Sequence, residues 1–284
     1  MDNRKDLEAV LAKLDTDLAF RFGEDFSSVS VDQGVETLAR IAGRGSVRSF
    51  TDKPVDSKLV ELLLAVAFSS PTKSDLQQRD VIIVDDPDLR FQLHDIIRHR
   101  WLDTTPVLLV ICGNNRRQRQ LHKWRNKPFA NDHLDAFFNA SVDAAILLAT
   151  LVVAAEAVGL GACPLSQIRN DAARAARILG LPDHVFPVAA LALGWPAEAP
   201  AITPRLPLAL TVHRNRFDDD KTRALVEAYD RRRADVQPYA RQRDEAEHGT
   251  VDDYGWSEEK ARHYSKPERA DFGQFIRDKG FRLT

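Results

Sequence analysis

A run of apolar residues near the middle of the chain constrains the fold more than any other feature. Residues 144–155 carry no charge between Asp143 and Glu156, and they belong to a stretch, 135–158, whose pattern predicts one long helix that is apolar on nearly every face. A run of about twelve residues is well short of the ~20 needed to span a bilayer. We therefore expect this helix to be enclosed by protein, in a core or at a subunit contact.

Short runs with the composition of β-strands lie on both sides of this helix. Three of them, at 81–84, 107–111 and 185–193, are rich in Val, Ile and Leu and are bounded by charged, proline or glycine residues. Such runs predict buried strands.

Helical patterns separate these strands. Residues 56–68 predict a helix with Asp56 as its N-cap, and a second helix is expected at 88–99. Asn170 is expected to cap a shorter helix that stops near Gly180. Strands interleaved with helices indicate an α+β or α/β sheet between layers of helices.

The two ends of the chain differ from this centre. We assign 1–40 to an N-terminal helical extension, 41–215 to the core, and 216–284 to a C-terminal helical arm in which arginine and aspartate dominate. Helical patterns in these ends are predicted at 4–20, 219–235 and 267–279. An arm of this composition is expected to need a partner surface.

The overall charge excludes some classes of partner. With 40 basic and 42 acidic residues, the net charge of -2 provides no general attraction to nucleic acid or to an anionic membrane. The basic segment 115–134 is interpreted as a mobile flap. The first residues are charged throughout and lack the pattern of a secretory signal, so we expect a cytoplasmic protein.

Several chemistries lack their sequence motifs. Cys112 and Cys163 form no CxxC pair and the eight histidines form no HExxH pair, so neither a disulfide framework nor a metal site is expected. Motifs of the types GxSxG, GxxxxGK(S/T) and GxGxxG are also missing. A hydrolase and a Rossmann dehydrogenase are therefore disfavoured.

Two segments carry arginines suited to a phosphate. Residues 44–50 place Arg44, Ser46 and Arg48 within five positions, and two guanidinium groups can fix one anion. Arg205 lies in a proline-stiffened stretch, 203–207, which presents it rigidly. The alternative interpretations are a solvated turn for the first segment and an exposed linker for the second.

Two further segments suit a flat polar ligand. Residues 69–78 offer many short polar side chains able to bond a ring, or else to satisfy the carbonyls of a helix end. Residues 159–167 contain two glycines that allow the backbone to approach a ligand closely, although Gly159 alone is more simply a helix C-cap.

In this order, the motifs RGSVRSF, GLGACPLSQIRN, GWPAEAPAITPRLP and PERADFGQFIRDKGF, the last preceded by Trp256 and Ser257, resemble the nitroreductase and flavin reductase family. The NADPH-dependent oxygen-insensitive nitroreductase branch, with its extended C-terminus, is the most similar. The resemblance runs from about Ile41 to the C-terminus. It implies an α+β sandwich with a mainly antiparallel central sheet flanked by helices. It also implies an intertwined homodimer, with FMN at the subunit interface, the 135–158 helix in the dimer core and the arm wrapped around the partner.

By motif position, the resemblance also implies the residues that bind the cofactor. The FMN phosphate would be bound by Arg44, Ser46, Arg48 and Arg205. The ribityl chain or ring would be bound by Thr72, Asp75 and Gln77. The backbone of Pro164, Leu165, Ser166 and Gln167 would pass the reactive flavin nitrogen and donate a hydrogen bond to it. This sequence departs from the branch at Gly45, at Thr203 and at Ser166–Gln167, where a basic residue, a lysine and a pair of glycines are expected.

The implied activity is hydride transfer from NADPH or NADH to nitroaromatic, quinone or flavin acceptors in ping-pong order. Because the flavin carries the chemistry, no catalytic side chain and no metal are expected. In the arm, Arg241 or Arg243 is the candidate for the 2′-phosphate of NADPH. Two alternatives stay open: an enzyme of the same fold specialised for one metabolite, and a flavin-binding protein with little turnover.

Overall fold

The computed structural model describes residues 3–28, 31 and 33–284, and the chain divides into two compact units. The first unit comprises Met1–Gly45 and Ala201–Glu268, and the second comprises Ser46–Pro200 and Arg269–Thr284. The boundary between Gly45 and Ser46 falls inside the first arginine motif. The units alternate along the sequence, and the division into 1–40, 41–215 and 216–284 stays a prediction.

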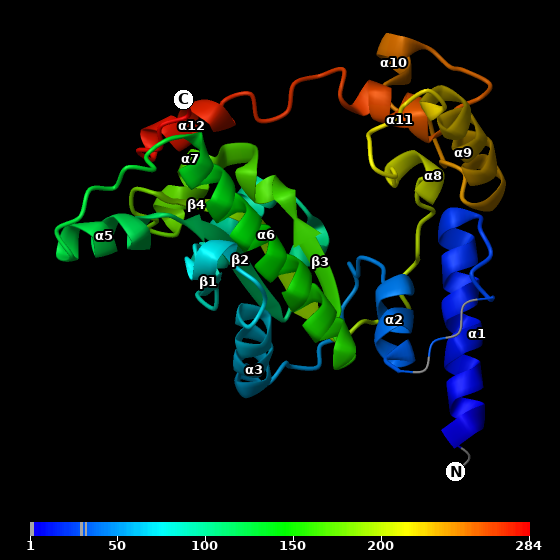
Figure 1. Ribbon diagram of the computed structural model, residues 1–284, viewed down its shortest axis with the longest axis horizontal. Coiled ribbons are helices and arrows are strands. Elements are labelled where there is room, and N and C mark those ends of the chain that lie inside the picture. The colour runs from blue at the N-terminus through cyan, green and yellow to red at the C-terminus, as the bar shows by residue number, and fades with distance from the viewer. Residues whose placement is uncertain (1–2, 29–30, 32) are drawn as a thin grey trace. The chain divides into compact units, whose positions relative to one another are not determined.

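The second unit is built on a four-stranded sheet (Figure 1). Its strands are β1 (Arg79–Ile83), β2 (Val107–Asn114), β3 (Gly161–Leu165) and β4 (Val185–Gly194). Their order is β1-β2-β4-β3, and each pairing is antiparallel. The expected α+β class with a mainly antiparallel sheet is confirmed. The three predicted strands are confirmed as well, whereas β3 was not predicted.

Helices cover both faces of this sheet because its central strands are apolar on both sides. In β2, Leu109 and Ile111 belong to a core cluster with α3 (Ser57–Phe68) and α6 (Leu134–Ala157). The intervening residues, Leu108 and Val110, belong to a second cluster with α4 (Pro87–Ile97). This alternation follows from the two-residue period of a strand. It explains why the predicted strands are continuous apolar runs.

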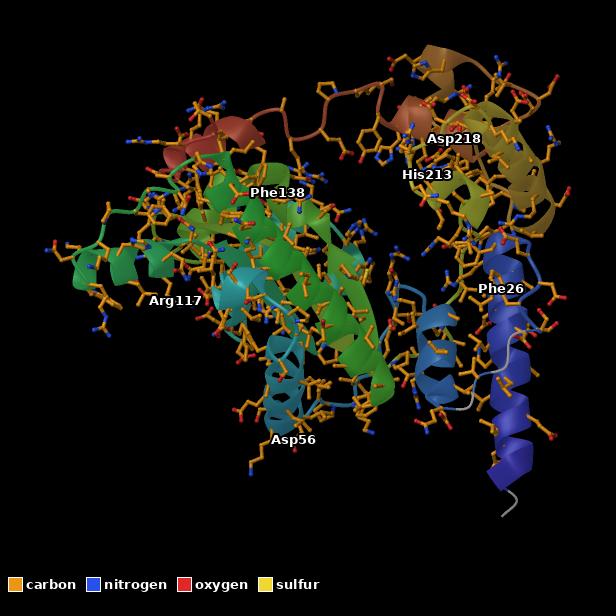
Figure 2. All side chains as sticks on the ribbon, in the orientation of Figure 1. Phe26, Asp56, Arg117, Phe138, His213 and Asp218 are labelled. Atoms are coloured by element: carbon orange, nitrogen blue, oxygen red, sulfur yellow. The ribbon has the colours of Figure 1, made fainter. Side chains whose placement is uncertain are left out.

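Helix α6 confirms the predicted long helix and crosses one face of the sheet (Figure 1). Leu147 and Leu151 are fully buried against the sheet. In contrast, the Leu134 and Phe138 side chains, the latter labelled in Figure 2, are 49% and 59% exposed. The single chain therefore encloses only one side of α6. Among the described residues, α6 is also the one helix whose length and composition match a membrane span, a test that core helices also pass.

The segment 115–134 begins with a regular helix, α5 (Arg116–Trp124), and its role as a mobile flap stays a prediction. Two local predictions need correction. Helix α7 (Ala172–Ile178) is capped by Asp171, whose carboxylate accepts a hydrogen bond from the Arg174 backbone N–H, so the assignment of the cap to Asn170 is wrong. Asn170 lies instead in the 3-10 helix η3 (Ser166–Asp171). The helix predicted at 267–279 is shorter and forms α12 (Phe272–Asp278).

The other predicted helices of the second unit are present. Asp56 caps α3 by accepting a hydrogen bond from the Lys58 N–H, as predicted, and α4 matches the helix expected at 88–99. Two short 3-10 helices complete the unit, η1 (Lys73–Asp75) and η2 (Arg100–Thr104).

The first unit is helical throughout its described regular elements. Helix α1 (Asn3–Phe22) packs on α2 (Val35–Ala42) through Leu14, Ala39 and Ala42. The remaining helices are α8 (Leu208–Thr211), α9 (Thr222–Val236), α10 (Glu245–His248) and α11 (Trp256–His263). The helices predicted at 4–20 and 219–235 are confirmed as α1 and α9.

Candidate functional site

The strip that carries Ser46 and Arg48 runs in extended form beside β3. The Val47 N–H donates to the Ala162 carbonyl at 3.1 Å, and Val47 is buried in the core. Neighbouring side chains on an extended backbone point to opposite faces. Ser46 is accordingly half-buried and Arg48 is exposed. Gly161 makes this approach possible, because a Cβ there would lie 2.7 Å from the Val47 side chain.

The end of β3 carries the residues predicted to pass the flavin ring. Leu165 is buried, Pro164 is exposed, and the half-buried Ser166 and Gln167 begin η3. The first N–H groups of a helical turn have no partner within the turn, so they can bond a ligand. The Ser166 hydroxyl accepts a hydrogen bond from Arg269 at 3.3 Å.

A separate loop carries the remaining predicted ring contacts. Thr72, Asp75 and Gln77 line a hollow of about 380 Å³ together with residues 68–71. The backbone φ angles of Ser74, Asp75 and Gln77 are 48°, 56° and 50°, in the left-handed region that non-glycine residues rarely adopt. Strained backbone of this kind costs about 1–3 kcal/mol per residue and persists where surrounding contacts enforce it, often at functional sites.

Two buried charged residues, not anticipated as site residues, enforce this loop. The Arg79 guanidinium donates to the carbonyls of Phe68, Ser70 and Pro71 at 2.7–2.9 Å. The carboxylate of Asp143, on α6, is fully buried and accepts hydrogen bonds from the backbone N–H groups of residues 73 and 78, both at 2.9 Å. Burial lowers the pKa of Arg79, and the negative charge of Asp143 opposes this effect. In the sequence, the only hint of these two residues is their position: Arg79 lies just before the apolar run 81–84, and Asp143 lies just before 144–155.

The sheet separates the predicted flavin contacts at β3 from those in the loop before β1. The Ser46–Arg48 strip and residues 164–167 lie along β3, whereas the loop with Thr72, Asp75 and Gln77 leads into β1. Strands β1 and β3 are opposite edges of the sheet. Three strand spacings separate them by about 14 Å. One copy of the chain therefore does not gather all of the predicted ring contacts at one edge.

The first unit brings together the two arginines expected at the phosphate. The half-buried Arg44 and the exposed Arg205, 161 positions apart in the sequence, both line a pocket of about 810 Å³. Its walls are otherwise mostly apolar side chains, including Leu14 and Leu18 of α1 and Ile41 of α2. The Thr203 hydroxyl accepts a hydrogen bond from Arg205. Thr203, at a position where the resemblance implies a lysine, thus positions a neighbouring arginine.

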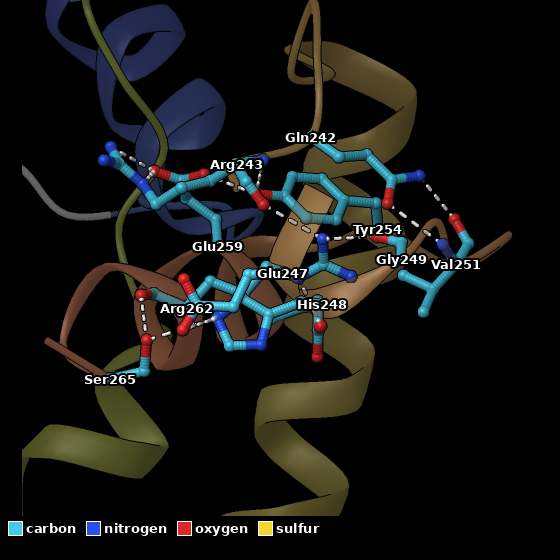
Figure 3. Close-up of polar contacts among 11 residues, drawn as sticks. Gln242, Arg243, Glu247, His248, Gly249, Val251, Tyr254, Glu259, Arg262 and Ser265 are labelled. Carbon is cyan, nitrogen blue, oxygen red and sulfur yellow. Dashed lines mark hydrogen bonds and ion pairs between the residues drawn. The ribbon is translucent and has the colours of Figure 1, made fainter. Parts of the chain in front are cut away.

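The arm contains a polar network that involves one of the two candidate arginines (Figure 3). Arg243 forms an ion pair with Glu259 at 2.9 Å, and the Tyr254 hydroxyl donates to the same carboxylate. The hydrogen bond with Glu259 raises the pKa of Arg243. Both arginines line a hollow of about 460 Å³, in which Arg241 is exposed and Arg243 is half-buried. Of the two, Arg241 is the better placed for a ligand.

Among the described residues, no group of three or more His, Cys, Asp or Glu side chains is arranged to hold a metal ion. The two cysteines are buried and are not joined in a disulfide, and burial raises the pKa of Cys112 to about 12. A thiol with so high a pKa is not ionised near neutral pH, so Cys112 is a poor nucleophile.

The sequence profile of the Nitroreductase family matches residues 41–195, and that of the Nitroreductase family, C-terminal domain, matches residues 203–284. The chain belongs to the nitroreductase family. This confirms the resemblance inferred from the ordered motifs. Helix α1 lies before the first residue that the family profile matches.

Relatives with assigned activities agree with this membership. The chain is 27% identical over 254 residues to an FMN reductase (NAD(P)H) of Bacillus subtilis, with 87% of this chain and 98% of the relative covered. It is 33% identical over 202 residues to an oxygen-insensitive NADPH nitroreductase of Salmonella typhimurium, covering 70% and 81%. Among solved structures, B. megaterium NfrA2 superimposes with a TM-score of 0.79 at 27% identity, covering 87% and 98%.

Proposed function

We propose that this protein transfers hydride from NAD(P)H to nitroaromatic, quinone or flavin acceptors in ping-pong order, using FMN bound at a subunit interface. Its family and the relatives named as FMN reductase and NADPH nitroreductase make it an NAD(P)H-dependent oxidoreductase with FMN as cofactor. The observation that supports the site best is that Arg44 and Arg205, which are distant in the sequence, line the same pocket.

The donor set of the chain fits FMN. The guanidinium groups of Arg44 and Arg205 suit a phosphate dianion, and so do the Ser46 hydroxyl and the Arg48 guanidinium, which follow Arg44 in the sequence. The hydroxyl, carboxylate and amide of the polar hollow that is formed by residues 68–72, 75 and 77 match the alternating donors and acceptors of a ribityl chain and a pyrimidine edge. The chemistry that bound FMN would supply is hydride transfer from the nicotinamide to the acceptor.

The chain's own part is to bind and orient. Residues 164–167 present backbone at the end of β3, where an N–H can bond a ring nitrogen. The loop with Thr72, Asp75 and Gln77 is held by hydrogen bonds from Arg79 and to Asp143, so its polar groups are already ordered. Little conformational entropy is therefore lost when a ligand binds. No side-chain acid or base is assigned.

Two features of the second unit support a homodimer. The predicted ring contacts lie at opposite edges of the sheet, so a second copy is needed to bring a Gln77 loop to a β3 edge. Apolar side chains are also left exposed on α3 and α6, with Leu62 57% and Phe138 59% exposed. Exposed apolar groups of this kind mark contact surfaces. We place α6 in that contact, with the C-terminal arm wrapping the partner and the enzyme in the cytoplasm.

A narrower substrate range is the second candidate function. Ser166 and Gln167 put side chains where the family branch has glycines, and Arg269 holds the Ser166 hydroxyl. Side chains here would restrict what stacks on the flavin, which favours an enzyme of the same fold specialised for one metabolite. A comparison of acceptors under identical conditions decides between broad and narrow preference.

The visible spectrum of the purified protein tests the proposal. Flavin absorption that bleaches on anaerobic addition of NADPH or NADH is expected, and the more effective nucleotide identifies the donor. Parallel lines in double-reciprocal rate plots are expected for ping-pong order, whereas intersecting lines would exclude it. Protein that cannot be reconstituted with FMN would overturn the proposal, and retained flavin without nucleotide oxidation would leave a binding protein.

A further inference from the structure

One arginine of the N-terminal extension contacts the backbone of both arginine segments. Arg21 lies in the last turn of α1 and is buried. Its Nε donates to the Ala42 carbonyl and its Nη2 to the Arg44 carbonyl, while Nη1 donates to the Thr203 carbonyl at 3.1 Å. A single guanidinium therefore bonds the carbonyls of residues 42, 44 and 203 at once.

A second arginine completes the connection from the other side. Arg232, on α9, donates to the Phe20 and Arg21 carbonyls at 2.9 Å and 2.8 Å, and to the Arg205 carbonyl at 3.0 Å. The Arg205 backbone N–H donates to the Arg21 carbonyl at 2.6 Å. The end of α1 thus lies between the two segments and is bonded to each of them.

The shape of a guanidinium makes this contact directional. Its five N–H donors lie in one plane in a rigid fork, so three acceptors bonded to it are held at defined relative positions. Hydrogen bonds from a charged donor are also roughly twice as strong as neutral ones. The carbonyls held by Arg21 belong to Arg44 itself and to a residue two positions before Arg205. The positions of both side chains therefore depend on Arg21.

We propose that Arg21 is a positioning residue for the FMN phosphate, through which helix α1 becomes part of the cofactor site. This inference rests on the proposed function. Arg21 acts by holding the backbone that presents Arg44 and Arg205, while those two side chains bind the anion. Because α1 precedes the region matched by the family profile, these contacts of Arg21 come from the N-terminal extension of this chain.

The test compares FMN with riboflavin, which has the same ring and ribityl chain but no phosphate. Full-length protein stripped of flavin is titrated with each ligand, as wild type and as Arg21→Met, Arg21→Lys and Arg223→Met. Arg223 is a matched control because it is an arginine of the same unit that is 92% exposed. Arg21→Met is expected to weaken FMN binding by about tenfold or more, as misplacement of binding groups does. Riboflavin affinity is expected to stay within about twofold, because no phosphate contact is involved.

The two other variants separate position from charge. Arg21→Lys keeps the positive charge but loses the fork, so its FMN affinity is expected to be intermediate, and Arg223→Met is expected to match wild type. Equal losses for FMN and riboflavin would show a merely structural role and overturn the proposal. Unchanged FMN affinity in Arg21→Met, or wild-type affinity in Arg21→Lys, would also overturn it.

A milder variant covers the case in which Arg21→Met does not fold. The Tyr229 hydroxyl donates to the Pro204 carbonyl at 3.2 Å, so Tyr229→Phe loosens the same segment. A smaller loss, confined to FMN, is expected, and an equal loss for both ligands contradicts the proposal. Wild-type protein that binds neither ligand would instead refute the proposed function.

Discussion

Arg79 in the second unit and Arg21 in the first both hold backbone carbonyls of candidate flavin segments, but in different surroundings. Arg79 starts a strand of the sheet, holds three carbonyls of one loop, and has the buried Asp143 as a nearby opposite charge. Arg21 ends a helix outside the matched family region and joins two segments distant in sequence.

The difference separates two roles for one kind of contact. Irregular segments leave carbonyls without helix or sheet partners, and a buried guanidinium can satisfy several of them at once. Where the arginine is part of the sheet core, its loss should damage folding first. Where it lies at the junction of two surface segments, its loss should mainly change ligand position.

The largest effect is expected for Arg79→Met. Removing this guanidinium leaves three carbonyls without their hydrogen-bond donor and the Asp143 carboxylate without a nearby positive charge. Breaking a buried charged network costs about 3–5 kcal/mol. Urea unfolding followed by circular dichroism measures the loss, with Arg79→Lys as the charge-preserving control. In that control, a smaller loss with equal weakening of FMN and riboflavin is expected. If the free energy of unfolding of Arg79→Met were no lower than that of Arg21→Met, the proposed difference between the two arginines would be wrong.

A medium effect is expected for Gly161→Ala, which tests how far the close contact between Gly161 and Val47 positions the strip with Ser46 and Arg48. The added Cβ would lie 2.7 Å from the Val47 side chain. Overpacking of this kind costs about 1–3 kcal/mol. Adding Val47→Ala should recover part of the lost stability, as measured by a double-mutant cycle. Additive losses would show that the close contact does not determine the position of the strip.

The smallest effect is an acid sensitivity of the first unit. Burial acts to raise the pKa of Glu259, but hydrogen bonds from Tyr254 and Arg243 outweigh it and hold the pKa below its ordinary 4.5. The carboxylate therefore stabilises the fold fully above pH 4.5, and this contribution is lost as the pH falls through the lowered value.

Hydrogen exchange corrected for intrinsic rates measures this effect. Protection of α11 amides should fall on acidification before that of β2 amides, whose strand is apolar and buried. Glu259→Gln should remove the difference between pH 5 and a lower pH. The same acid response in both units of wild type would contradict the assignment to Glu259.

Local sequence predicted the regular elements best where one pattern dominated. The helices α3, α4, α6 and α9 and the strands β1, β2 and β4 lie within a few residues of their expected positions. Strand β3 was missed because Pro164 and the nearby glycines are weak strand formers, and its pairing with β4 outweighs that preference. Asn170 and Asp171 are both good cap residues, so composition did not distinguish them.

The candidate ligands were predicted from motif order, but their grouping was not. Nothing local to Asp143 or Arg79 shows that they meet the same loop, because the contacts of Asp143 lie 65 and 70 positions away in the chain. Arg21 was equally hidden in an ordinary amphipathic helix. Its Thr203 partner lies 182 positions away.

The sequence by itself determined the alternation of strands and helices, the family, and the kinds of donor available to a phosphate and a flat ring. These depend on side-chain chemistry and on periods of two or 3.6 residues, which are local. Only the tertiary structure decided the strand order β1-β2-β4-β3, the shared pocket of Arg44 and Arg205, and the carbonyls bonded by Arg21 and Arg79. Which backbone groups lack a local partner, and which distant side chain reaches them, is settled only when the whole chain closes on itself.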